Sequence, residues 1–129
     1  MTACPCGKAD ARSKPVAYES CCGRYIAGGH DAPDAQTLMR SRYAAFVMCH
    51  EAYLLSTWHP TTRPAQAAPD PATKWLGLEV RSHSQMDDTH AQVEFVARYR
   101  TGGKGDRLHE RSRFVNEEGR WYYVDGELL

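Results

Sequence analysis

The sequence predicts an α+β domain in which N-terminal helices pack on a curved antiparallel sheet, preceded by a small cysteine-rich module. Four of the five cysteines lie before Gly23. A helical apolar pattern follows at residues 35–49, and four runs of strand-forming residues, separated by turn-forming residues, fill the second half. With 129 residues, the chain can form one domain with a real core and a small appendage. We expect a boundary between residues 1–30 and residues 31–129.

The composition is that of a soluble globular protein without a strong charge of either sign. Sixteen basic residues balance sixteen acidic residues, so no overall field attracts nucleic acid or an anionic membrane. The chain has no apolar run of about eighteen residues, the length that a membrane span needs, and its first segment is polar, unlike a secretory signal. We therefore expect a cytoplasmic protein with reduced thiols, and neither a membrane nor nucleic acid as a partner.

The cysteines form two tight pairs, which are the most specific chemical signal in the chain. Zinc prefers four soft ligands in a tetrahedron, and two close pairs of thiolates supply them. Pro5 fixes the backbone between the first two ligands, and a glycine after each pair permits a tight turn. The sequence therefore predicts a structural zinc site with these ligands: Cys4, Cys6, Cys21 and Cys22. A disulfide between the pairs and free thiols remain open as alternatives.

The segment around these cysteines has few large apolar residues. Val16, Tyr18, Tyr25 and Ile26 are the sizeable ones, and their burial does not offset the entropy lost when the segment becomes ordered. A structural zinc ion supplies folding free energy directly. We hypothesise that this segment is ordered only with metal or by docking on the main domain.

Cys4-Pro5-Cys6-Gly7, followed by Cys21-Cys22-Gly23, resembles the SEC-C motif, the short zinc module at the C-terminus of the Sec translocase motor ATPase. The loop is longer here, with fourteen residues between Cys6 and Cys21. The resemblance implies that the zinc module docks a protein partner, such as a secretion component or the ribosome.

A helix is predicted for residues 35–49. Asp34 is a typical N-cap, and apolar side chains repeat on one side of the segment. Cys49, at its end, is interpreted as a small core residue. A second short helix at residues 51–58 ends before a proline. Between the cysteine module and the first helix, Gly28-Gly29 is expected to let the module be positioned independently, unless it packs on the sheet domain.

Residues 59–74 contain four prolines and predict a loop, which we interpret as a plain connection in preference to a lid. Four strands are predicted at residues 74–84, 90–101, 107–116 and 120–125. Along the second strand, apolar residues alternate and share one face: Val93, Phe95, Ala97 and Tyr99. Helices on one face of such a meander leave a cone with an open mouth, a common ligand site.

Several segments of the chain resemble the YchJ-like family of bacterial proteins. They read LMRSRYAAF, TWHP, WLGL, HERSRF and WYYVDG, at residues 38–46, 57–60, 75–78, 109–114 and 121–126. Members of this family pair an N-terminal SEC-C motif with a nuclear transport factor 2-like domain. The resemblance implies a nuclear transport factor 2-like cone, a fold that hosts isomerases, dehydratases and non-enzymatic binders alike.

Polar and aromatic side chains that could converge in this cone form a candidate pocket. They are Arg40, Arg42, Tyr43, Trp58, His59, His109, Arg111, Arg113, Trp121 and Tyr123. His59 is interpreted either as a capping or surface histidine or as a general base. The aromatic members suit either a core or a flat ligand.

Alternation along the third predicted strand places His109, Arg111 and Arg113 on one face, with Glu110 and Ser112 on the other. The basic face is either a solvated charged surface or an arginine-lined site for a carboxylate or phosphate. Sequence alone does not decide between these interpretations.

The chain carries no H-E-x-x-H, P-loop or G-x-S-x-G signature of an enzyme. Four thiolates leave a zinc ion no open position, so the metal is expected to be structural. The favoured hypothesis is a zinc-binding protein-interaction adaptor without enzymatic activity. The alternatives are small-molecule binding or isomerase-like or dehydratase-like activity in the cone, and nucleic-acid binding through the basic residues of the module, Lys8, Arg12, Lys14 and Arg24.

Overall fold

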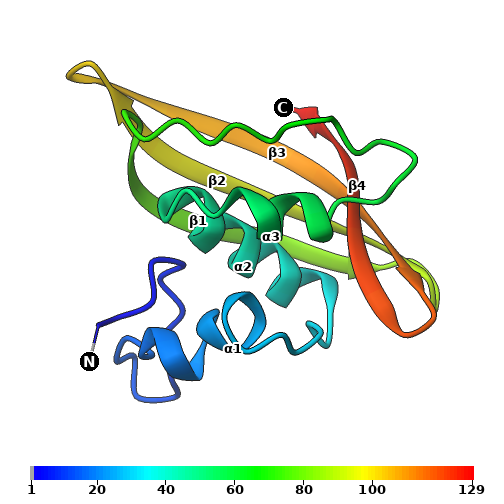
Figure 1. The fold of residues 1–129 in the computed structure, drawn as a ribbon. Coiled ribbons are helices and arrows are strands. Elements are labelled where there is room, and N and C mark those ends of the chain that lie inside the picture. The colour runs from blue at the N-terminus through cyan, green and yellow to red at the C-terminus, as the bar shows by residue number, and fades with distance from the viewer. Residues whose placement is uncertain (1) are drawn as a thin grey trace.

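Four strands form one antiparallel sheet in the order β1-β2-β3-β4 in a computed structural model that describes residues 2–129. The strands are β1 (Lys74–Gln85), β2 (His90–Thr101), β3 (Lys104–Glu117) and β4 (Arg120–Leu128). Ahead of them come the 3-10 helix η1 (Tyr18–Ser20) and the α-helices α1 (Gly23–Ile26), α2 (Ala35–Val47) and α3 (Glu51–Ser56). This is the predicted α+β architecture, with helices first and a meander after them (Figure 1).

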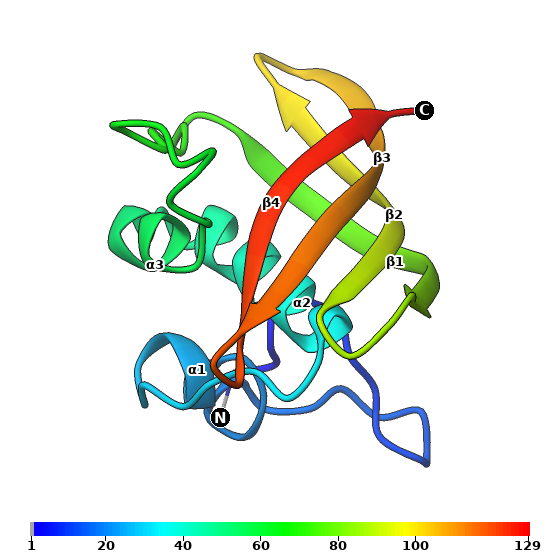
Figure 2. The same ribbon diagram turned by 90° about the vertical axis from the view of Figure 1, so that its right-hand side faces the viewer.

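The sheet is strongly curved, and the helices cover its concave face (Figure 2). Register shifts interrupt the β1–β2 pairing near Gly77 and Ser82, and the β3–β4 pairing near Phe114. Such bulges bend a strand and increase its twist, so they account for part of the curvature. The β2–β3 and β3–β4 turns contain glycines in the left-handed region, with φ of 61° and 83° at Gly102 and Gly103 and 83° at Gly119.

Helix α2 begins where the sequence predicts, because Asp34 Oδ1 accepts a hydrogen bond of 2.7 Å from the Thr37 backbone N–H. It ends at Val47, two residues before the predicted end. Cys49 then adopts a φ of 55°, which turns the chain toward α3 and leaves the thiol exposed. The prediction that Cys49 is a core residue is therefore wrong.

The core lies between α2 and the concave face of the sheet. Val93, Phe95 and Ala97 on β2 are at most 6% exposed, and Tyr99 is half-buried, as the alternation predicts. Leu38, Met39 and Tyr43 on α2 pack against this face together with Phe114 and Trp121.

The connection at residues 57–73 is tied to the rest of the fold at both ends. Its first part pairs with β4, since His59 N–H donates to the Tyr123 carbonyl at 2.7 Å. Further along, Glu51 Oε2 accepts hydrogen bonds of 3.0 and 2.9 Å from Ala67 and Ala68 N–H. These bonds agree with a plain connection.

The cysteine module packs directly on α2 (Figure 1). Arg40 Nη1 donates a hydrogen bond of 3.1 Å to the Cys6 carbonyl, and Tyr25, which is 8% exposed, joins the cysteines to the same apolar cluster as the sheet core. The glycine linker is hydrogen-bonded, with Gly28 N–H donating to the Gly23 carbonyl at 3.0 Å. Because the module packs on α2, the alternative of an independently positioned module does not hold. Within residues 2–129, no helix has the length and apolarity to cross a membrane.

Candidate metal centre and sheet-domain cavity

The four predicted ligands meet at one point beneath α2. The Sγ atoms of Cys4, Cys6, Cys21 and Cys22 all lie within 4.8 Å of one another, and the four residues are at most 5% exposed. Cys6 and Cys21 bring their sulfurs to 3.6 Å, close to the ~3.8 Å edge of a tetrahedron with metal–sulfur bonds of about 2.3 Å. The donor set therefore fits a tetrahedral, thiophilic metal ion. None of the five cysteines forms a disulfide.

Local backbone geometry brings the two pairs together. Cys4 N–H donates to the Val16 carbonyl at 2.8 Å, which closes the loop between the pairs. Gly7 has a φ of 75°, a conformation that suits glycine, and its N–H turns back to the Cys4 carbonyl at 3.2 Å. Gly23 lies against Tyr18 so closely that a Cβ would overlap the Tyr18 carbonyl oxygen. Both glycines are thus required by the fold of the site.

The thiols influence one another strongly. Hydrogen bonds from Cys22 and Cys4 lower the pKa of Cys6 to about 2, and burial raises the pKa of Cys21 to about 12. The cluster on its own stabilises one thiolate, because each further negative charge would be buried beside the first. A bound divalent cation supplies the positive charge that lets all four thiols ionise.

A cavity of about 230 Å³ lies between α2 and the concave face of the sheet. Its walls are mainly apolar and aromatic, and include Met39, Phe46, Trp75, Phe95, Leu108 and Phe114. Tyr43 and Phe46 pack on Trp75 with ring centroids 5.6 and 6.0 Å apart. The polar groups that line this cavity are Arg42, Tyr43, Trp58, Glu110, Ser112 and Tyr123.

Arg42 is the buried cation of this cavity, with 5% of its surface exposed. Its Nη1 donates to the Leu54 carbonyl at 2.8 Å and to Thr57 Oγ1 at 2.7 Å. The guanidinium carbon lies 5.0 and 4.5 Å from the ring centroids of Trp58 and Tyr123. Within the described chain, no carboxylate oxygen lies within 4.0 Å of it. Burial lowers the pKa of Arg42 to about 10, so the side chain stays charged at neutral pH.

Glu110 and Ser112 extend from β3 into the same cavity. Ser112 is 2% exposed, and its hydroxyl donates a hydrogen bond of 2.5 Å to Glu110 Oε2. On β4, Gly126 pairs with Ser112, and a Cβ at Gly126 would overlap the Glu110 carboxylate. A glycine at this position therefore leaves the space that the carboxylate occupies.

Two further polar groups belong to residues that line the cavity. The indole Nε1–H of Trp58 is buried and has no hydrogen-bond partner among residues 2–129. Burial, together with the negative charge of Glu110, raises the pKa of Tyr123 to about 12, so its hydroxyl is neutral and retains its proton at physiological pH. The Trp58 and Tyr123 rings meet edge to face, with centroids 5.0 Å apart.

Four of the ten predicted pocket residues line this cavity: Arg42, Tyr43, Trp58 and Tyr123. Arg40 points instead to the cysteine module. His59 is not among the residues that line the cavity. Its Nε2 lies 3.0 Å from Glu117 Oε1, and its Nδ1 is bonded to Thr61 Oγ1 at 2.7 Å. Trp121 lines a separate hollow of about 320 Å³ between the cysteine module and α3.

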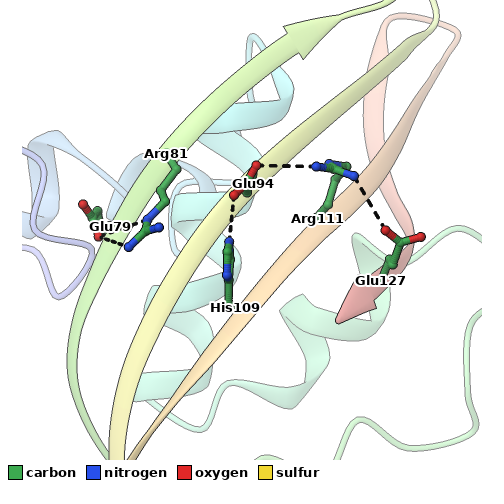
Figure 3. Close-up of polar contacts among 6 residues, drawn as sticks. All are labelled: Glu79, Arg81, Glu94, His109, Arg111 and Glu127. Carbon is green, nitrogen blue, oxygen red and sulfur yellow. Dashed lines mark hydrogen bonds and ion pairs between the residues drawn. The ribbon is translucent and has the colours of Figure 1, made fainter. Parts of the chain in front are cut away.

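His109 and Arg111 of β3 lie on the face of the sheet opposite the helices, away from the cavity (Figure 3). His109 Nε2 bonds to Glu94 Oε2 at 2.7 Å, and Arg111 lies 3.6 Å from both Glu94 and Glu127. Arg113 Nε bonds to Asp125 Oδ1 at 2.6 Å. Since His109, Arg111 and Arg113 each have an acidic partner, they belong to a solvated charged surface, and the predicted site for an anion is not formed by these three residues.

Comparison with known proteins adds the family. The model of the family described as "YchJ, middle NTF2-like domain" matches residues 34–126. The chain belongs to the YchJ-like family. A UPF0225 protein from Polaromonas sp. (strain JS666) is 60% identical over 127 residues, which cover 96% of this chain and 91% of that protein. The UPF0225 protein BPP1723 from Bordetella parapertussis is 59% identical over 129 residues, covering 98% and 92%.

Two solved structures resemble this YchJ-like chain over the cysteine module as well as the sheet. The solution structure of a SEC-C motif containing protein from Rhodopseudomonas palustris has a TM-score of 0.81 and 34% identity, and covers 99% of both chains. The crystal structure of a SEC-C motif containing protein from Psychrobacter arcticus has a TM-score of 0.80 and 33% identity, and covers 97% of this chain and 81% of the other. The predicted SEC-C and nuclear transport factor 2-like resemblances are thereby confirmed.

Sequence reasoning on this YchJ-like chain missed Glu110 and Ser112 as cavity residues. The alternation places both on the face opposite His109 and Arg111, but it does not say which face meets the helices. One signal was available. A serine flanked by charged residues on a strand gains nothing from burial unless its hydroxyl has a partner, and Glu110, two residues away on the same face, supplies one.

Proposed function

We propose that this YchJ-like protein binds a small molecule in the sheet-domain cavity, and that a structural zinc ion holds the module that supports α2. The observation that carries the proposal is the state of the polar groups in that cavity. Arg42, which is buried and has no carboxylate oxygen within 4.0 Å, lines a mainly apolar and aromatic space of about 230 Å³ together with Glu110, Ser112 and Tyr123.

The energetics favour a ligand over an empty cavity. A buried donor left unsatisfied costs about 1–3 kcal/mol, and such groups are rare in native proteins. The remaining walls are apolar and aromatic, the usual lining of a small-molecule site. An apolar, aromatic space of about 230 Å³ is filled more favourably by an organic ligand than by water.

The zinc ion has a supporting role in this proposal. Four thiolates complete its coordination, so no position is open for a substrate. The metal orders the module, and the module contacts α2 through the bond from Arg40 to the Cys6 carbonyl. Arg42, two residues further along α2, lines the cavity.

Matched cavity-filling variants test the binding proposal. Leu108 lines the cavity, whereas Leu76 is 47% exposed. Saturation-transfer NMR with single-ring aromatic fragments of neutral, anionic and cationic types should detect binding to the wild type and to Leu76→Trp, and no binding to Leu108→Trp. If no fragment binds the wild type, or if Leu108→Trp binds equally well, the proposal is wrong.

A protein-interaction adaptor is the second candidate, and one observation favours it. The loop between the cysteine pairs is an ordered, exposed hairpin, since Ala9 bridges Pro15 and Asp10 Oδ1 accepts bonds from Arg12 and Lys14 N–H. It presents Lys8, Arg12 and Lys14 to solvent. Its basic tip suits an acidic partner, and the SEC-C likeness suggests the ribosome or a secretion component.

Charge reversal tests the adaptor candidate. Changing Lys8, Arg12 and Lys14 to glutamate should abolish cosedimentation with ribosomes, or capture of a secretion component, without loss of zinc. The matched control reverses three exposed basic residues at the β2–β3 end of the sheet, Arg98, Arg100 and Lys104. If both variants lose partner binding to the same extent, or if neither variant loses it, the result counts against a specific basic docking surface.

A further inference from the structure

We infer that the sheet-domain cavity selects neutral aromatic ligands that carry a hydroxyl group, of the phenol type, over aromatic carboxylates and amines. This inference rests on the proposed function, namely that the cavity binds a small molecule. Three features carry it: the charge balance of the lining, the donors and acceptors it offers, and the aromatic walls.

The lining is charge-balanced. Among the described residues that line the cavity, Arg42 and Glu110 are the charged ones, and their formal charges are opposite. A buried charge without compensation is costly in a low-dielectric site. A carboxylate ligand would add a second negative charge beside Glu110, and an ammonium ligand would add a second positive charge beside Arg42. A neutral ligand leaves the balance intact.

The hydrogen-bonding groups favour a hydroxyl over other neutral groups. Glu110 lines the cavity and is an acceptor whose Oε2 already takes the Ser112 bond. A carboxylate has about four acceptor positions, so it can take a further bond. A hydroxyl both donates and accepts, whereas a carbonyl only accepts. A phenol can therefore donate a hydrogen bond to Glu110, which a carbonyl compound cannot.

Contacts around Tyr123 place these groups in one part of the cavity. The Trp58 ring lies 5.0 Å from the Tyr123 ring, and the Arg42 guanidinium carbon lies 4.5 Å from it. The charge of Glu110 contributes to the raised pKa of Tyr123. The polar group of a ligand is therefore expected next to Tyr123.

The rest of the cavity suits an aromatic ring. Trp75 with Tyr43 and Phe46, and Phe114 with Tyr123, form edge-to-face and tilted pairs with centroids 5.6 to 6.0 Å apart. The volume of about 230 Å³ exceeds that of the engineered cavity of about 150 Å³ that holds a benzene molecule. One ring with a short substituent fits this space.

Four probes of nearly equal size test the inference by isothermal titration calorimetry: 4-propylphenol, 4-propylbenzoate, 4-propylbenzylamine and propylbenzene. The wild type should bind 4-propylphenol about tenfold or more tightly than each of the other three. If the benzoate or the amine binds more tightly than the phenol, or if propylbenzene binds equally well, the inference is wrong. In each of these cases the proposed function still stands. Absence of binding by all four, and by every fragment of the NMR screen, overturns both.

Substitutions separate the charge effect from the donor effect. Glu110→Gln removes the negative charge at nearly constant shape, so it should reverse the order and favour the benzoate over the phenol. Glu94→Gln makes the same change on the convex face and should leave the order unaltered. Trp58→Phe removes an indole N–H that is enclosed in the fold and keeps an aromatic wall, so the preference for the phenol should persist. An unchanged order in Glu110→Gln contradicts the inference.

Discussion

The cysteine cluster and the sheet-domain cavity are both buried groups of polar atoms, and they differ in how complete they are. At the cluster, four thiols meet within 4.8 Å and supply the full set of ligands that a tetrahedral metal needs. At the cavity, Arg42 has no carboxylate partner and Trp58 Nε1–H has no partner at all within residues 2–129. We call the cluster a closed site, because its set of ligands is complete, and the cavity an open site, because its polar groups are not all paired.

This difference separates support from binding. A closed set of ligands has nothing left to offer a substrate, so its contribution is stability and position. An open set has hydrogen-bonding groups that no residue of the described chain satisfies. In the proposed function, the most recognisable motif in the sequence has the supporting role, and the less conspicuous residues of α2, β3 and β4 form the candidate binding site.

Removing one of the four cysteine ligands should have the largest effect on metal content and stability. Cys6→Ser removes a fully buried ligand, so we expect loss of the metal, disorder of residues 2–30 and a fall in the free energy of unfolding of more than about 4 kcal/mol. Metal analysis and amide NMR spectra measure these changes. Cys49→Ser, at an exposed thiol, is the control and should change neither. Retention of one equivalent of zinc by Cys6→Ser would contradict the closed site.

Removing the hydrogen bond between Arg42 and Thr57 should have the next largest effect on stability. Thr57→Val removes the hydroxyl that accepts a bond from Arg42 and is only 3% exposed. Loss of a hydrogen bond to a charged group should lower the free energy of unfolding by about 1.5–3 kcal/mol in urea denaturation. Ser56→Ala, next to it but exposed, should have a much smaller effect. Equal effects would show that Arg42 does not depend on Thr57.

Displacing the carboxylate of the open site should have a small effect on stability and a large one on selectivity. In Gly126→Ala the added methyl group overlaps the Glu110 side chain, which must move, and because Gly126 is exposed this costs little stability. The preference for the phenol probe should disappear. Gly77→Ala, where a Cβ meets nothing within 4 Å, serves as the control. If Gly126→Ala keeps the wild-type preference, Glu110 does not set the selectivity.

The convex face should show the smallest effect, confined to acid pH. The hydrogen bond from His109 lowers the pKa of Glu94. A carboxyl with a lowered folded-state pKa stabilises the fold above its unfolded pKa, and this contribution is lost as the pH falls through the folded value. In His109→Gln, NMR titration should find the pKa of Glu94 raised and ligand binding unchanged. An unchanged pKa would contradict the assigned cause.

Much of the fold could be predicted because its signals are local. Asp34 caps α2, the alternation of Val93, Phe95 and Ala97 marks the buried face of β2, and glycines mark the turns. The position of Cys49 could not be predicted in this way. Its left-handed conformation is uncommon for a residue other than glycine, and it is imposed by the turn that brings α3 beside α2.

The two candidate sites differ in the same way, because one depends on local sequence signals and the other on tertiary structure. The cysteine pairs are close in sequence, and their residue type specifies their chemistry. The cavity draws Arg42, Glu110 and Tyr123 from three elements, so their proximity depends on strand pairing and sheet curvature. Alternation along β3 separates Glu110 from His109, but only the tertiary structure shows which of them faces α2.

The indole N–H of Trp58 provides the most direct test of an open site. In ¹H–¹⁵N spectra, titration with 4-propylphenol should shift the Trp58 indole signal saturably, because the probe binds against Trp58, which lines the cavity. The signal of Trp121, which lies outside the cavity, should stay in place. An unmoved Trp58 signal at saturating probe, or equal shifts of Trp58 and Trp121, would contradict the account.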